Sequence, residues 1–123
     1  MLEPIVKLSK ERIIKALKEL GLTQVDIQVY IFLAKEGSHR MGEIALALNL
    51  PEEKVDRSLK ELQSISIIKA SIEYPLEFVA MPFEKVIDLF IEVKREQAKT
   101  MQESREELLS SWKTIIKKET TKS

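Results

Sequence analysis

The chain has 123 residues, with no cysteine and only one histidine, His39. Without cysteine it can form neither a disulfide framework nor a thiolate metal site, and one histidine cannot make a histidine cluster. The sequence also lacks a Gly-rich phosphate loop, a Ser-His-Asp set and any metal-ligand spacing. We therefore expect no metal and no cofactor, and we expect that the protein is not an enzyme.

Long apolar runs are missing as well. Residues 1–7 lack the apolar core of a secretory signal, and no segment approaches the roughly 20 apolar residues that span a bilayer. We expect a cytoplasmic protein that makes no membrane contact.

An excess of one charge is also absent, because 20 basic and 20 acidic residues cancel. Proteins that bind nucleic acid often carry a basic excess. Binding to DNA would therefore depend on a few well-placed cations, and we expect it to be modest and sensitive to salt.

Glycine and proline are scarce, which favours helices, and apolar residues recur at helical spacing in the first half of the chain. The last of these helices opens with Pro51, whose missing N–H costs nothing in a first helical turn. The pattern predicts helices over residues 9–20, 23–36, 40–48 and 51–65.

Local signals mark the ends of these helices. Ser9 is a candidate cap for the first helix, and Thr23 with Asp26 resembles a capping box. Gly21 suits the positive φ that ends a helix, and Asn49 suits the left-handed position after the third helix. Within the fourth helix, a stripe that repeats at i, i+4 and i+7 is predicted to be buried, namely Val55, Leu59 and Leu62.

Two β-rich runs follow, over residues 67–71 and 76–81, and a short turn with a proline separates them. This pattern predicts a hairpin. A hairpin directly after three helices with tight turns is the layout of a winged helix-turn-helix. The fold class is thus mainly α with a small β-hairpin.

No glycine or proline occurs from residue 83 to about residue 118, which predicts one long helix. Its seam steps by four and three residues, although Lys94 and Arg105 interrupt it. A single helix with an apolar stripe needs a partner, and a second copy of the chain is the simplest one. The residues expected to form the dimer are Ile87, Ile91, Ala98, Met101, Leu108, Trp112 and Ile115.

Several segments together resemble one known family, the TrmB-type archaeal winged-helix transcriptional regulators. Residues 17–23, Leu-Lys-Glu-Leu-Gly-Leu-Thr, match its L-x-x-L-G-L-T opening, and residues 29–33 match V-Y-x-x-L. Residues 43–45 and 50–55 continue the likeness, and residues 80–84 match the A-x-P-x-E junction after the wing. The resemblance covers about residues 14–95.

The resemblance implies a regulator whose helix over residues 51–65 lies in the major groove, with the wing against the DNA backbone. Longer members carry a C-terminal sugar-binding domain, for which this chain leaves no room, so we expect no small-molecule effector. The chain departs from the family pattern at Glu52, Glu53 and Asp56, which place acids on the recognition helix, and at Ser66, where a glycine commonly precedes the wing.

The expected DNA contacts come from three places: the start of the third helix, the exposed side of the fourth, and the wing. Cations there can meet phosphates, and an arginine can also read a guanine edge. The plainer interpretation is a solvated helix surface on which Glu53 pairs with Arg57 and Asp56 with Lys60. The candidate residues are Ser38, His39, Arg40, Glu53, Lys54, Arg57, Lys60, Lys69 and Tyr74.

Two hypotheses remain open. The first is a homodimeric, DNA-binding transcriptional regulator, with a winged helix-turn-helix domain over residues 1–82 and a dimerisation helix over residues 83–123. The second is a winged helix that binds a protein of the transcription or chromosome machinery and binds DNA weakly or not at all. The mixed charge of the recognition helix favours the second hypothesis, and the resemblance favours the first.

Overall fold

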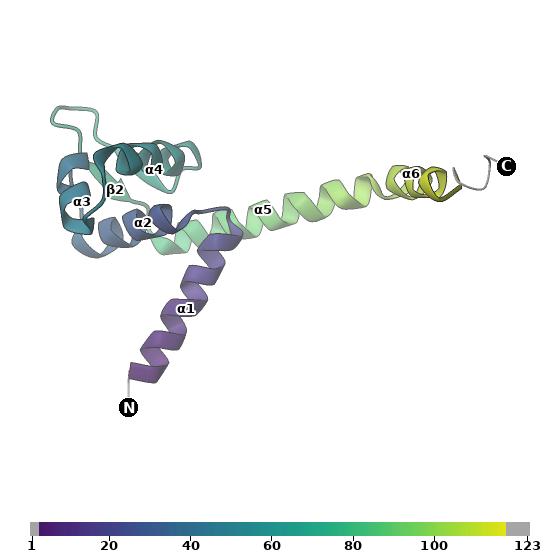
Figure 1. Cartoon of the computed structure of the whole chain (residues 1–123), viewed down its shortest axis with the longest axis horizontal. Coiled ribbons are helices and arrows are strands. Elements are labelled where there is room, and N and C mark those ends of the chain that lie inside the picture. The colour runs from purple at the N-terminus through teal and green to yellow at the C-terminus, as the bar shows by residue number, and fades with distance from the viewer. Residues whose placement is uncertain (1–2, 118–123) are drawn as a thin grey trace. The chain divides into compact units, whose positions relative to one another are not determined.

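The structure, a computed structural model, describes residues 3–117 and gives side-chain positions from residue 8 onward. This part of the chain contains six helices and a two-stranded antiparallel sheet, in agreement with the predicted fold class (Figure 1). The elements are α1 Glu3–Glu19, α2 Gln24–Glu36, α3 Met41–Leu48, α4 Glu52–Ser64, β1 Ile68–Ala70, β2 Phe78–Ala80, α5 Phe83–Glu103 and α6 Arg105–Lys117.

The chain divides into two compact units, residues 1–87 and residues 88–123. The first contains α1 to α4, the hairpin and the start of α5, and the second contains the rest of α5 and α6. None of the helices described is both long enough and apolar enough to cross a membrane.

The local signals set most helix ends as predicted. The Thr23 hydroxyl accepts a hydrogen bond from the Asp26 amide at 3.1 Å, and the Asp26 carboxylate accepts one from the Thr23 amide at 3.0 Å, which completes the capping box. Gly21 has a φ of 92° after α1, and Asn49 has a φ of 55° after α3. Side-chain capping and tolerance of positive φ therefore end these helices.

The predicted start of the first helix is wrong. Ser9 is not a cap but an interior residue of α1, which begins six residues earlier, at Glu3. Pro4 lies in the first turn of α1, where a backbone N–H has no acceptor within the helix, so the N–H that proline lacks is not needed. The fixed φ of proline also suits a helix. The proline therefore permits the longer helix.

The core of the first unit forms where α2 and α4 pack together. Val55, Leu59 and Leu62 on α4 are buried as predicted, and Val29 and Leu33 are buried on α2, which packs against α4. Further apolar side chains from the other elements close this core, including Leu17, Ile44, Ile67, Ile68 and Val86.

The hairpin is short and its register is fixed at three positions. Lys69 in β1 pairs with Val79 in β2, Ile68 pairs with Ala80, and Ala70 pairs with Phe78. The backbone of His39 adds a bridge to the outer side of β2, with amide–carbonyl distances of 3.1 and 2.8 Å to Phe78. The segment before α3 is thereby fixed to the wing.

The predicted long C-terminal helix is not continuous. Ser104 separates α5 from α6, although its amide still donates to the Thr100 carbonyl at 3.0 Å and its carbonyl accepts from the Leu108 amide at 2.9 Å. Residues 102–107 carry no apolar side chain, and serine has a lower helix propensity than the glutamine, glutamate and arginine residues around it. The predicted end near residue 118 lies outside the described residues.

Candidate nucleic-acid interface

The outward side of α4 carries mixed charge. Lys54, Arg57 and Lys60 are exposed there, opposite the buried stripe. The Lys60 ammonium lies 3.0 Å from the Asp56 carboxylate, so this predicted ion pair forms. The predicted pair between Glu53 and Arg57 does not form. Within residues 3–117, two of the three cations are therefore free to meet a phosphate.

A hollow of about 250 Å³ lies between the start of α2 and the side of α4. Lys54 and Arg57 line it from α4, together with Glu61. Asp26 also lines it, but its carboxylate accepts hydrogen bonds from the Thr23 amide and the Ser58 hydroxyl. The groups that this hollow presents to solvent are thus two cations and one acid.

The three candidate residues before α3 differ in whether their side chains remain available to contact DNA. The Ser38 hydroxyl donates to the Glu77 carboxylate at 2.8 Å, which ties this segment to the end of the wing loop. The His39 ring lies 2.8 Å from the Gly37 carbonyl and makes an edge contact with Phe32, at a centroid distance of 4.9 Å. Only the side chain of Arg40 is exposed without such a contact among the residues described.

The wing carries little positive charge. Lys69 on β1 is exposed, whereas the loop over residues 71–77 contains no cation. Two side chains of this loop are almost fully exposed to solvent: Ile72 is 98% exposed and Tyr74 is 87% exposed. Glu73 lies between them. Lys69 is therefore the wing residue suited to a phosphate contact.

One buried polar contact that positions α4 was not predicted from the sequence. The Ser58 hydroxyl donates a hydrogen bond to the Asp26 carboxylate at 2.5 Å, and both residues are only 3% exposed. The capping box identified Asp26 but gave it no partner outside α2. Ser58 could have been suspected, because it lies on the same face of α4 as Val55, Leu59 and Leu62.

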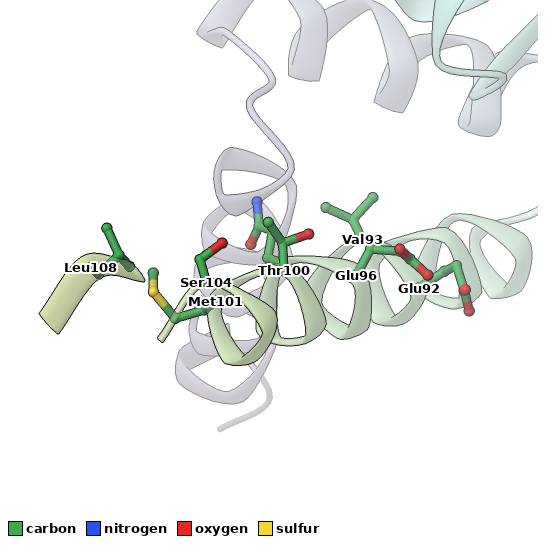
Figure 2. A pocket seen from close by; sticks show the side chains of 8 residues that line it. Glu92, Val93, Glu96, Thr100, Met101, Ser104 and Leu108 are labelled. Carbon is green, nitrogen blue, oxygen red and sulfur yellow. The ribbon is translucent and has the colours of Figure 1, made fainter. Parts of the chain in front are cut away.

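The predicted dimer residues are exposed on α5 and α6. Trp112 is 58% exposed, and Met101, Leu108 and Ile115 are each at least half exposed. Figure 2 shows an open hollow on this surface, where side chains of α5 and Leu108 of α6 line it on either side of Ser104. Its other lining residues are Glu92, Val93, Glu96, Gln97, Thr100 and Met101. No described residues gather in a cluster of His, Asp and Glu that could hold a metal ion.

The sequence profile described as "Sugar-specific transcriptional regulator TrmB" matches residues 17–84, more than half of the chain. This match confirms the resemblance found in the sequence. No curated protein matches the chain.

Several solved structures share the fold, at identities that bear on the fold alone. A possible transcriptional regulator from Methanosarcina mazei Go1 is 16% identical, with 77% of this chain and 87% of that one covered and a TM-score of 0.66. A MarR family protein from Bacillus stearothermophilus is 16% identical, with coverages of 98% and 88% and a TM-score of 0.52. MepR from S. aureus, solved as a DNA complex, is 18% identical, with coverages of 90% and 97% and a TM-score of 0.51. The first unit is thus a winged helix.

Proposed function

Because the chain belongs to the TrmB family and is a DNA-binding transcriptional regulator, we propose that it acts as a homodimer that inserts α4 into the major groove. The profile match ends at residue 84, so the sugar specificity in the family's description is not carried over to this chain. In this proposal the protein works in the cytoplasm, needs no small-molecule effector and catalyses no reaction.

The arrangement of cations on α4 carries this proposal. Lys54 and Arg57 are exposed on the side of α4 that faces away from the core, and Lys60 follows them along the helix. In the helix-turn-helix mode of binding, the second helix presents such side chains to base edges and phosphates. Arg40 before α3 and Lys69 on the wing would add phosphate contacts on either side.

The acids on α4 limit how strongly it can bind. Glu53 and Asp56 repel phosphates, and Asp56 also holds Lys60 in an ion pair. Either acid can still accept a hydrogen bond from a cytosine amino group, so they favour some sequences over others. The proposal therefore predicts modest affinity with a selective base preference.

Dimerisation would supply the second α4. The apolar side chains on α5 and α6 lack a partner in the described chain, and a second copy would cover them. Two linked α4 helices would contact half-sites about one helical turn apart, which predicts a roughly palindromic operator.

Fluorescence anisotropy with random duplex DNA across a salt series tests the proposal. We expect the wild type to bind at low salt with a negative slope of log K against log salt. Arg57→Glu and Lys54→Glu should each weaken binding and flatten this slope by about one or more, since each removes a phosphate contact. Lys99→Glu, an equal charge change on α5, is the matched control and should bind like the wild type.

The same measurement distinguishes the rival hypothesis. If the folded wild type is not retained by DNA even at low salt, α4 is not a DNA-reading helix, and the winged helix would then serve as a protein-binding module. Circular dichroism of the same sample establishes that the protein is folded.

A further inference from the structure

A second hollow in the first unit lies between α1 and α2 and reaches the end of α3. It measures about 570 Å³, within the range that holds a drug-sized group. Its floor is apolar and contains Ile14, Ile27, Ile31, Phe32 and Leu48. We call this hollow the α1–α2 groove.

The rim of the α1–α2 groove is positive. Lys10 and Lys18 line it from α1 and Lys35 lines it from α2, against a single acid, Glu36. None of these four side chains forms an ion pair with another described residue. In a chain whose net charge is zero, the groove is thus a local surplus of unpaired cations over an apolar floor.

The wing tip, residues 72–74, has the complementary character. It presents Ile72 and Tyr74, which are almost fully exposed, with the carboxylate of Glu73 between them. Burial of these two side chains in a contact would be favourable, because it would remove apolar surface from water. The tip does not occupy the α1–α2 groove of the same chain, because Ile72 and Tyr74 are exposed to solvent.

The loop that carries the tip is held in shape before any partner binds. The Ser71 amide donates to the Glu77 carbonyl at 2.8 Å, and the Glu77 amide donates to the Ser71 hydroxyl at 2.9 Å. The Ser71 hydroxyl in turn donates to the Glu73 carbonyl at 3.1 Å. Because these bonds pre-organise the loop, docking of the tip would lose little conformational entropy.

We propose that the wing tip of one copy docks into the α1–α2 groove of a second copy. Ile72 and Tyr74 would cover the apolar floor, and Glu73 would face the lysines of the rim. DNA is a poorer partner for this tip, since the tip carries an acidic side chain and no cation. The tip and the groove are complementary in charge and in apolar surface, and both surfaces occur on every copy of the chain. A second copy can therefore supply the partner.

The contact is heterologous, because two different surfaces of the chain meet. Such contacts generate rings or open rows of molecules, in contrast to the closed symmetric pairing proposed for α5 and α6. The tip is small, so its contact lies below the standard interface size of about 1,200–2,000 Å² and is weak in dilute solution. Copies bound side by side on DNA would meet at a high effective concentration and bind cooperatively.

The test is sedimentation velocity without DNA, over a protein concentration series at low salt. We expect the wild type to associate beyond the species formed through α5 and α6 as concentration rises. Glu73→Lys and Lys18→Glu should each weaken this association by about tenfold, since each places like charges against one another. Ile72→Asp should weaken it as well, whereas Leu46→Asp, an equal change at another exposed apolar residue, should not.

Mixing the two charge variants decides the assignment. The lysine at the tip of Glu73→Lys faces the glutamate in the groove of Lys18→Glu, and the remaining surfaces still form wild-type pairs. An equimolar mixture should therefore associate as the wild type does. If neither charge variant weakens association, or if the mixture stays as weak as its components, the proposal is wrong.

The readout does not depend on DNA binding, so the two proposals can fail separately. A small anionic amphiphile is the other group that could fill the groove, and 8-anilinonaphthalene-1-sulfonate serves as its probe. If Lys18→Glu lowers the affinity for this dye while the wild type shows no concentration-dependent association, the groove is a small-molecule site and the docking proposal is wrong.

Discussion

The hydroxyl of Ser58 on α4 donates a hydrogen bond of 2.5 Å to the carboxylate of Asp26, which caps the start of α2. These two residues lie 32 positions apart and both are buried. One carboxylate thus shapes the first turn of α2 with one oxygen and holds α4 with the other. The orientation of the candidate DNA-reading helix therefore depends on a residue outside it.

Replacing Ser58 tests this link. Ser58→Ala leaves a buried carboxylate oxygen of Asp26 without its donor, so the free energy of unfolding should fall by about 1–3 kcal/mol. Urea denaturation followed by circular dichroism measures the change. Ser64→Ala is the control, because the exposed Ser64 hydroxyl donates only to the Glu61 carbonyl, and its effect should stay within about 0.5 kcal/mol. Equal midpoints for the two variants would contradict the assigned role of Ser58.

Ionisation of Tyr30 makes the stability of the fold depend on pH in the alkaline range. Its hydroxyl donates to the Met81 carbonyl at 2.8 Å, and desolvation by burial raises the pKa of Tyr30 above its usual value of 10.0. The unfolded chain loses this proton at lower pH than the folded chain does. The contribution of Tyr30 to stability is therefore fully present below about pH 10 and is lost as pH rises through the folded-state pKa.

Tyr30→Phe should remove both the hydrogen bond and this titration. We expect the variant to be less stable near neutral pH by about 0.5–1.5 kcal/mol, with a smaller further loss above pH 10 than the wild type shows. Urea midpoints from pH 7 to pH 11 measure both effects. Tyr74→Phe, at the exposed wing tip, should follow the wild-type curve throughout. A parallel decline of Tyr30→Phe and wild type above pH 10 would refute the titration argument.

Ser66 holds a strained backbone conformation. Its φ is 64°, between α4 and β1, at the position where the family pattern commonly has glycine. The left-handed region costs a residue with a Cβ roughly 1–2 kcal/mol, and glycine avoids that cost while it adds some freedom to the unfolded chain. Ser66→Gly should therefore raise the thermal midpoint by a few degrees. Asn49→Gly, at a φ of 55°, should gain less, since asparagine tolerates this region better. A lower midpoint for Ser66→Gly would overturn the assignment of strain.

Asp56 restrains Lys60 on the face proposed to meet DNA. Asp56→Asn breaks the 3.0 Å ion pair and removes a charge that repels phosphates. We expect DNA affinity to rise about two- to fivefold at low salt, with a steeper salt slope. Anisotropy titrations measure both quantities, and Asp88→Asn on α5 is the matched control. An unchanged slope would mean that Lys60 does not approach the DNA backbone.

The seam on α5 and α6 should determine the oligomeric state. Trp112→Asp places a charge in the proposed dimer interface twice, once from each copy, and should raise the dimer dissociation constant more than tenfold. Analytical ultracentrifugation at micromolar protein measures it. Lys113→Asp, one residue further along α6 and off the seam, should leave the constant close to that of the wild type. A dimer that withstands Trp112→Asp would place the interface elsewhere.

Sequence alone determined the features that depend on neighbouring residues. The capping box at Thr23, the turn at Gly21 and the left-handed Asn49 follow from short-range hydrogen bonds and backbone sterics, so the local pattern predicted them correctly. The buried stripe of α4 followed from helical periodicity. The family motifs then identified the winged helix, which the profile match over residues 17–84 confirmed.

The tertiary structure decided what distant residues do to one another. The bond between Ser58 and Asp26 and the bridge between His39 and Phe78 join segments far apart in sequence, where periodicity carries no information. The division between α5 and α6 at Ser104 was not predicted, because an apolar repeat predicts which face of a helix is buried and not where the helix is interrupted. The proposed contact between the wing tip and the α1–α2 groove also depended on the tertiary structure, because only burial showed that both surfaces lack a partner among the described residues.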